Sequence, residues 1–120
     1  MEKYTEEELE EALRIVTSAI GRCEKMQPKF SEGTSQHTLL KNRLKALHFS
    51  KSLLTDEPAI RFTREELVEA LRPISSIASK CEKALVKFEE GSAHHTRFQN
   101  MVRAMSISKS LITNEIGKRG

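Results

Sequence analysis

The sequence predicts an all-α protein: an antiparallel four-helix bundle made of two tandemly duplicated helical hairpins with pseudo-twofold symmetry. The main observation is a repeat. Residues 4–57 recur as residues 62–115 without a gap, and 26 of the 54 paired positions carry the same residue. Each copy contains two helix patterns with start signals. Only 5% of residues are aromatic and Trp is absent, a composition that favours helices over a β-sandwich or barrel.

Chain length predicts one domain, residues 1–120. With 120 residues, of which 38% are apolar and 31% charged, the chain fits a single globular unit. Each copy alone is close to the lower size limit for independent folding. We therefore expect the two hairpins to share one core.

The first helix of each copy begins at a matched start signal. Thr5 is an N-cap residue, and Glu8 three positions later completes a capping box. Tyr4 and Leu9 are spaced as a hydrophobic staple across this cap. Thr63 begins the same signal in the second copy. Acidic residues in the first turn also complement the positive end of the helix dipole.

An apolar seam follows each start signal, with spacings of three and four residues in alternation. This heptad pattern is typical of helices that pack along their length at a shallow crossing angle. Pro28 and Pro73 fall within the two predicted helices, so we expect a local kink at each. The seam residues are Leu9, Leu13, Val16, Ile20, Cys23, Gln27 and Phe30 in the first copy, and Leu67, Leu71, Ile74, Ala78, Cys81, Leu85 and Phe88 in the second.

Glycine and cap residues predict where each hairpin turns. Gly33 and Gly91 stand where a helix end is expected, and Thr34 or Ser35 and Ser92 are N-cap candidates for the next helix. The second helices are therefore predicted over residues 36–54 and 94–112. Residues 55–61 are the expected linker between the hairpins, and residues 116–120 are the expected flexible tail.

The second helices are apolar over an unusually wide arc, which one partner helix cannot cover. One stripe continues the hairpin core. The other, called the second stripe below, predicts an interaction surface for a homodimer or a protein partner. The alternative is that the four helices of one chain already enclose it. The second stripe consists of Leu39, Ala46, Phe49 and Leu53 in the first copy and Ala104, Ile107 and Leu111 in the second.

Basic residues on the second helices raise a different possibility, binding to a nucleic-acid backbone. A pair of basic helices related by a twofold axis can follow the phosphates of a duplex. The basic pattern is only partly repeated, however, and no aromatic residues interleave with it. The alternative is a solvated face that balances the acidic first helices. The candidate contacts are Lys41, Lys45, Lys51, Arg97, Arg103 and Lys109.

Repeated cysteine and histidine residues are the remaining candidates for chemistry. Cys23 and Cys81 occupy matching seam positions on helices that lie diagonally or at different heights, so we expect free buried thiols and no disulfide. His37 and His95, each with a nearby glutamate, offer two ligands per loop, whereas zinc takes three or four from the protein. We therefore predict no metal site and no cofactor, and assign the histidines to the packing of helix ends.

No motif with a known catalytic chemistry is present in the sequence. A phosphate-binding glycine loop, a nucleophile elbow, Cys-x-x-Cys and His-Glu-x-x-His are all absent. The predicted function is therefore a non-catalytic helical interaction or scaffold module, not an enzyme, with self-association as one form of it. The alternative is a modest sequence-independent nucleic-acid-binding protein, which a net charge of +3 permits.

The expected location is the cytoplasm, with no membrane partner. No apolar run approaches the roughly 20 residues that cross a bilayer. The first residues lack the order of charged and apolar segments found in a signal peptide. Two cysteines in the whole chain are too few for a disulfide framework.

Overall fold

The computed structural model describes residues 4–55 and 62–119. All regular structure in these ranges is helical, which confirms the all-α class with four main helices. The elements are α1 (Glu6–Met26), the short 3₁₀ helix η1 (Gln27–Lys29), α2 (Ser35–Leu54), α3 (Arg64–Leu85) and α4 (Ala93–Arg119).

Both predicted capping boxes are confirmed. The Glu8 backbone N–H donates to Thr5 Oγ1 at 3.1 Å, and the Thr5 N–H donates to the Glu8 carboxylate at 3.0 Å. Thr63 and Glu66 make the same reciprocal pair at the start of α3, at 3.0 Å in each direction. These bonds satisfy backbone donors that a helix start otherwise leaves without partners.

The turns inside the two hairpins also follow the sequence signals. Gly33 and Gly91 have φ angles of 89° and 85°, which residues with a side chain rarely adopt. Thr34 caps α2 by accepting from the His37 backbone N–H, and Ser92 accepts from that of His95 at the start of α4. The chain therefore reverses direction at matched positions in both copies.

Several predicted boundaries differ from the structure or lie outside the described residues. The helical seams do not continue to Phe30 and Phe88, because α1 ends at Met26 and α3 at Leu85, and Pro28 lies in η1. A 3₁₀ turn thus replaces the kink expected at Pro28, whereas Pro73 lies inside α3. The predicted flexible tail 116–120 is helical as far as Arg119, and Ile116 packs against the core. Except for Thr55, the predicted linker lies outside the described residues.

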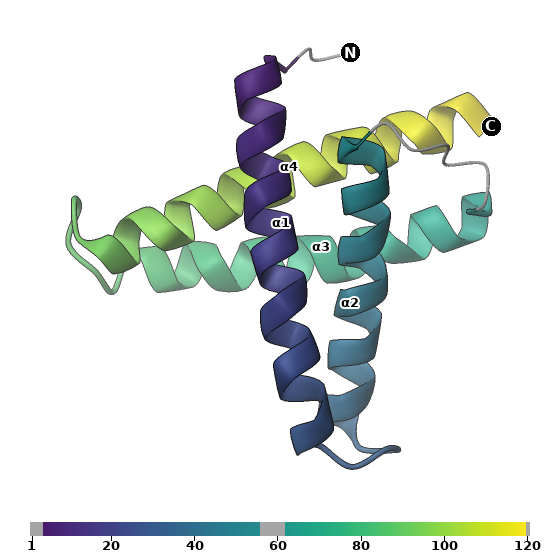
Figure 1. The fold of residues 1–120 in the computed structure, drawn as a ribbon, viewed down its shortest axis with the longest axis horizontal. Coiled ribbons are helices and arrows are strands. Elements are labelled where there is room, and N and C mark those ends of the chain that lie inside the picture. Colours follow the sequence, from purple (N-terminus) through teal and green to yellow (C-terminus); the bar gives the residue numbers. More distant parts are fainter. Residues whose placement is uncertain (1–3, 56–61, 120) are drawn as a thin grey trace.

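The two hairpins cross. Figure 1 shows α1 beside α2 and α3 beside α4, with the first hairpin laid across the second, so that the loop end of each projects beyond the crossing. The extents of 41 × 39 × 19 Å fit two crossed layers. α1 packs on α4 and α2 on α3, while no Cα atom of α1 lies within 8 Å of one in α3. This arrangement differs from the single aligned bundle that the heptad seams predicted.

Small residues at the crossing explain the difference. Ala12 of α1 and Ala104 of α4 are buried along one groove between the hairpins, and Ala46 of α2 and Ala70 of α3 along another. Alanines let two helices approach closely at one point without interlocking along their length. The heptad seam sets the packing inside each hairpin and leaves the angle between hairpins to these contacts.

One continuous apolar core draws on all four helices. Its members come from both copies of the repeat, so the interior belongs to neither hairpin alone. None of the helices in the described ranges combines the length and apolar character needed to span a bilayer. The largest apolar side chains that are fully buried are Val16, Leu47, Leu67, Ile74, Met105 and Ile112.

Two buried serines at matching positions give a first prediction. Ser50 donates from its hydroxyl to the Ala46 carbonyl at 3.1 Å, whereas the Ser108 hydroxyl has no partner among the described residues. A buried polar group without a partner destabilises the folded state. We therefore expect Ser108→Ala to raise the free energy of unfolding by up to about 1 kcal/mol, and Ser50→Ala to lower it by about 1 kcal/mol. Urea denaturation of the two variants measures both; changes of the same sign and size would contradict the difference in bonding.

Candidate functional site

The second stripe lies mostly inside the molecule. Ala46, Phe49, Ala104 and Ile107 are buried in the core shared by the hairpins, while Leu53 and Leu111 are half-buried against it. The Phe49 ring packs on that of Phe62 with the centroids 4.1 Å apart. Leu39, near the start of α2, is 41% exposed. Apart from Leu39, the second stripe therefore lies where it is expected if the four helices of one chain enclose it.

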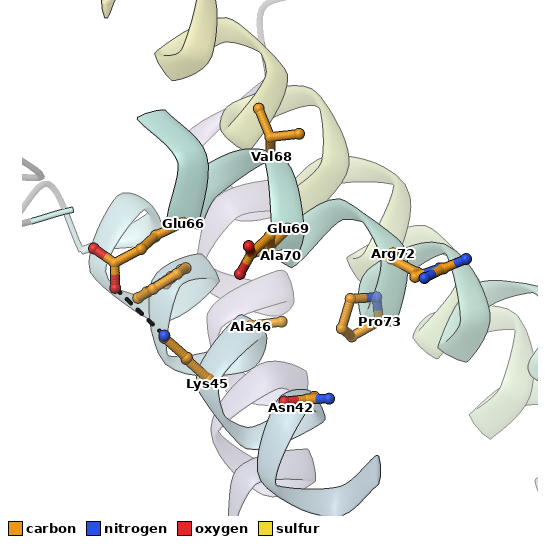
Figure 2. A pocket seen from close by; sticks show the side chains of 10 residues that line it. Asn42, Lys45, Ala46, Glu66, Val68, Glu69, Ala70, Arg72 and Pro73 are labelled. Carbon is orange, nitrogen blue, oxygen red and sulfur yellow. Dashed lines mark ion pairs between the residues drawn. The ribbon is translucent and has the colours of Figure 1, made fainter. Parts of the chain in front are cut away.

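A groove of about 490 Å³ runs between α2 and α3, beside the crossing (Figure 2). Lys45 on α2 points toward Glu66 on α3, with 3.4 Å between Nζ and the carboxylate oxygen Oε2. The Glu66 pKa is lowered, first by its hydrogen bond from the Thr63 backbone N–H and then by Lys45. Lys45 therefore faces a carboxylate that is ionised at neutral pH.

A matching groove of about 240 Å³ lies between α1 and α4. Arg103 takes the place of Lys45 in it, among three glutamates of α1. The Glu11 pKa is lowered, mainly by a hydrogen bond from Arg14 and to a smaller extent by Arg103. Eight of the ten residues that line this groove stand 58 positions from residues that line the other: Glu8, Glu11, Ala12, Ile15, Asn100, Arg103, Ala104 and Ile107 match Glu66, Glu69, Ala70, Pro73, Asn42, Lys45, Ala46 and Phe49.

The six basic residues predicted to contact nucleic acid are dispersed. Lys45 and Arg103 lie in the two grooves with glutamates. Arg97 lines a different cavity, and Lys109 lines a hollow beside Tyr4. Lys41 is exposed and Lys51 is half-buried on α2. The structure therefore does not bring the six together in one groove.

The histidines lie near the loop ends of separate hairpins. His37 and His95 are half-buried, and their backbone N–H groups take part in the helix caps described above. The neighbouring His94 stacks its ring on Phe88, with the centroids 4.9 Å apart. Within residues 4–55 and 62–119, no three His, Cys, Asp or Glu side chains are grouped closely enough to hold a metal ion.

The two cysteines are free thiols on helices that stand apart. Cys23 belongs to α1 and Cys81 to α3, and the Cα separation of more than 8 Å between these helices exceeds the roughly 7 Å limit for a disulfide. Burial raises the pKa of both thiols, and the positive charges of Arg22 and Arg43 partly oppose that shift. Both thiols therefore lie within electrostatic reach of the same two arginines.

The raised pKa values of Cys23 and Cys81 predict that both thiols react slowly with disulfide reagents. The thiolate is the reactive form, and a raised pKa leaves less of it at about pH 8. We expect a disulfide reagent such as dithiobis(nitrobenzoate) to label the native protein at least about tenfold more slowly than the protein unfolded in guanidinium. Stability should also fall as pH rises above the ordinary thiol value of 9.0, because only the unfolded state then loses its thiol protons readily. Equal labelling rates in the two states would contradict this account.

A third cavity, here called the arginine cavity, was not predicted from the sequence. It encloses about 640 Å³ between α1 and the second hairpin, and the described residues that line it include three arginines and no carboxylate. Arg14 is already paired with Glu11, and Arg22 Nη1 donates to Ser18 Oγ at 3.0 Å. The lining residues are Arg14, Ile15, Ser18 and Arg22 of α1, Cys81 of α3, and Ala93, Thr96, Arg97, Phe98, Asn100 and Met101 of α4.

One sequence signal pointed toward this cavity. Arg14, Ser18 and Arg22 are spaced by four residues and therefore share one face of α1. The spacing does not reveal that this face and Arg97 of α4 line the same cavity.

Comparisons of the chain with protein families, with curated proteins and with solved structures found no match. The proposals below are therefore argued from the residues of this chain alone.

Proposed function

We propose that the protein is a non-catalytic interaction module of the cytoplasm, and that it self-associates through the projecting loop ends of its two hairpins. The observation that carries this proposal is the set of apolar side chains exposed at those ends. Met26 and Leu39 are exposed near the loop of the first hairpin, and Val86 and Phe88 near that of the second. Val86 is 87% exposed and Phe88 is 37% exposed, so two apolar side chains close together in the chain face solvent at one end.

The crossed arrangement supports the choice of this surface over the second stripe. The two helices of a projecting end have only each other as neighbours, so the opposite hairpin does not cover them (Figure 1). Both ends carry the same residues at several positions, among them Gly33 and Gly91, and His37 and His95. Each molecule thus presents two related ends, and a second copy of this chain supplies a related surface for either. Closed symmetric pairs of this kind are the commonest oligomers.

Two further features fit the proposal. Matching positions line the grooves on the two sides of the crossing, which supports a tandem duplication with pseudo-twofold symmetry as the origin of the fold. Two free cysteines are compatible with a reducing compartment such as the cytoplasm.

Sedimentation tests the self-association. We expect the wild-type weight-average mass to rise from the monomer value toward that of a dimer between low and high micromolar concentration. Val86→Glu should keep the protein monomeric over this range, because it places a charge where the apolar contact forms. The matched control is Val68→Glu, at a valine that is 44% exposed and lies beside the groove between α2 and α3. A monomeric wild type, or an equal effect of the two variants, rejects the proposal.

Sequence-independent binding of nucleic acid is the weaker proposal. It relies on Lys41, Lys51, Arg97 and Lys109, because Lys45 and Arg103 lie among carboxylates. Titration of the protein with duplex and single-stranded oligonucleotides at low and high salt tests it. Neutralising phosphates should give an affinity that falls steeply with salt concentration. A flat titration at low salt, or binding that ignores salt, rules it out.

A further inference from the structure

The surfaces through which the two hairpins meet are alike. Ala12 of α1 and Ala70 of α3 stand at equivalent positions of the repeat, and so do Ala46 of α2 and Ala104 of α4. All four alanines are buried and line the two grooves beside the crossing. Each hairpin therefore presents to the other nearly the same surface that it receives. The hairpin of a second copy fits such a surface as well as the chain's own hairpin does.

The charges at the crossing follow the same rule. Lys45 of α2 lies 3.4 Å from the Glu66 carboxylate of α3 (Figure 2). In the other groove, Arg103 of α4 lies in the lining with Glu8 of α1, the residue equivalent to Glu66. In both grooves, a second helix thus places a cation beside carboxylates on the first helix of the opposite hairpin.

The contact between the hairpins is incompletely packed. Grooves of about 490 and 240 Å³ flank the crossing, and the arginine cavity of about 640 Å³ also lies between α1 and the second hairpin. Ser108 follows Ala104 by one turn on the same face of α4, and its buried hydroxyl has no partner among the described residues. Hollows forgo van der Waals contacts, and such a hydroxyl destabilises the folded state. Weakly held parts of a protein separate before global unfolding, so we expect the hairpins to part before the helices within them do.

We propose that two copies of the chain exchange hairpins, so that α1 and α2 of each molecule pack on α3 and α4 of the other. Exchange of an identical element is a low-cost route to a dimer. It requires the hairpins to separate, so it takes place when the chain folds at high concentration, and a purified monomer stays monomeric during sedimentation. The surface is the inner face of the hairpins, so the inference goes beyond the proposed function and does not depend on the loop ends.

Pairing of unlike hairpins is favoured because it needs no repacking. Phe49 of α2 packs on Phe62, just before α3, and in the exchanged dimer it meets the same ring of the other copy. The Tyr4 hydroxyl, which donates to Ser110 Oγ at 2.9 Å, also keeps its partner type. If two first hairpins paired instead, Phe49 would meet Tyr4, the residue equivalent to Phe62, and the bond to Ser110 would be lost.

Refolding two charge variants together tests the exchange. Lys45→Glu and Glu66→Lys each place like charges across the groove of their own chain. In an exchanged dimer with one copy of each, the two substituted residues face one another, and Lys45 of one chain faces Glu66 of the other. Both chains also carry Val86→Glu, which removes association through the loop ends. One chain is labelled with heavy nitrogen, and both are unfolded in urea, mixed and refolded at near-millimolar concentration. We expect native mass spectrometry to show mixed over like dimers at least about threefold above random pairing.

The matched control is a mixture of Lys41→Glu and Glu65→Lys, again with Val86→Glu in both chains. These substitutions make the same charge changes on the same helices, at exposed positions outside the groove lining. We expect random pairing in this mixture. Glu66→Lys also removes a capping-box bond, but it does so in every assembly alike and favours none of them. An absence of dimers, or an equal ratio in the two mixtures, overturns the exchange and leaves the loop-end proposal to the sedimentation of the wild type.

A second measurement needs no change of charge in the groove. The Val86→Glu chain alone is refolded at near-millimolar concentration, and its dimer is isolated and diluted to low micromolar concentration. Exchanged copies separate only by opening the core that they share, so we expect the dimer to persist for at least about a minute. Dissociation within the time of dilution overturns the exchange.

Discussion

Replacing Ala104 with glutamate is expected to unfold the protein. Ala104 is 1% exposed and lines the groove where α4 meets α1. A glutamate there is too large for the close approach of the two helices, and its carboxylate is removed from water at the crossing. Together these effects destabilise the protein by several kcal/mol, against a typical total stability of about 5–15 kcal/mol. Circular dichroism and a urea titration measure the loss of helix and of cooperative unfolding.

Ser106→Glu is the matched control for this variant. It adds the same charge two positions along the same helix, where the side chain is exposed. We expect its urea midpoint to stay close to that of the wild type, since surface substitutions usually change stability by no more than about 0.5 kcal/mol. If Ala104→Glu also unfolded at the wild-type midpoint, the hairpins would not meet at Ala104.

The second large effect is expected for Leu47→Ala. Leu47 is 1% exposed in the core shared by the hairpins, so truncation leaves a cavity that the neighbouring side chains only partly fill. We expect the free energy of unfolding to fall by about 2–5 kcal/mol, with an unchanged dependence on urea concentration.

The control for Leu47 is the same substitution on the same helix. Leu39 is 41% exposed, so Leu39→Ala should lower the free energy of unfolding by less than about 1 kcal/mol. The difference between the two variants measures how strongly the core depends on the inner face of α2. Similar losses would mean that α2 buries a different face from the one described.

Sequence reasoning was most successful where a structure depends on residues close together in the chain. The capping boxes at Thr5 and Thr63 need only residues within one helical turn, and both form. The caps at Thr34 and Ser92 depend on equally local geometry. Local hydrogen bonds and helix propensity determine these features, so the pattern of residues predicts them directly.

The angle between the hairpins could not be predicted in the same way. A heptad seam reports which faces meet inside a hairpin, and the second stripe reports only that a further face is apolar. An aligned bundle and a crossed pair bury that stripe equally well in principle. The choice depends on contacts between distant residues, such as Ala12 with the α4 groove and Ala46 with the α3 groove, whose geometry no local pattern contains.

The arginine cavity was missed for a related reason. Its basic residues come from different elements, and none of Arg14, Arg22 or Arg97 is remarkable by itself in a charged, helical sequence. The available signal was the spacing of Arg14, Ser18 and Arg22, which places them on one face of α1 without indicating which residues of α4 lie opposite.

Joining both copies in one chain has an evolutionary consequence. If two separate, identical hairpins formed this crossed assembly, every substitution would appear on both sides of the twofold axis at once. A half-buried arginine such as Arg43, with two buried donors that lack a partner in the described part of the chain, would then occur in both halves, and its energetic cost would be doubled. In a single chain, positions 43 and 101 vary independently. One half thereby carries an arginine at this position, while the other carries a methionine, Met101, that packs against the core.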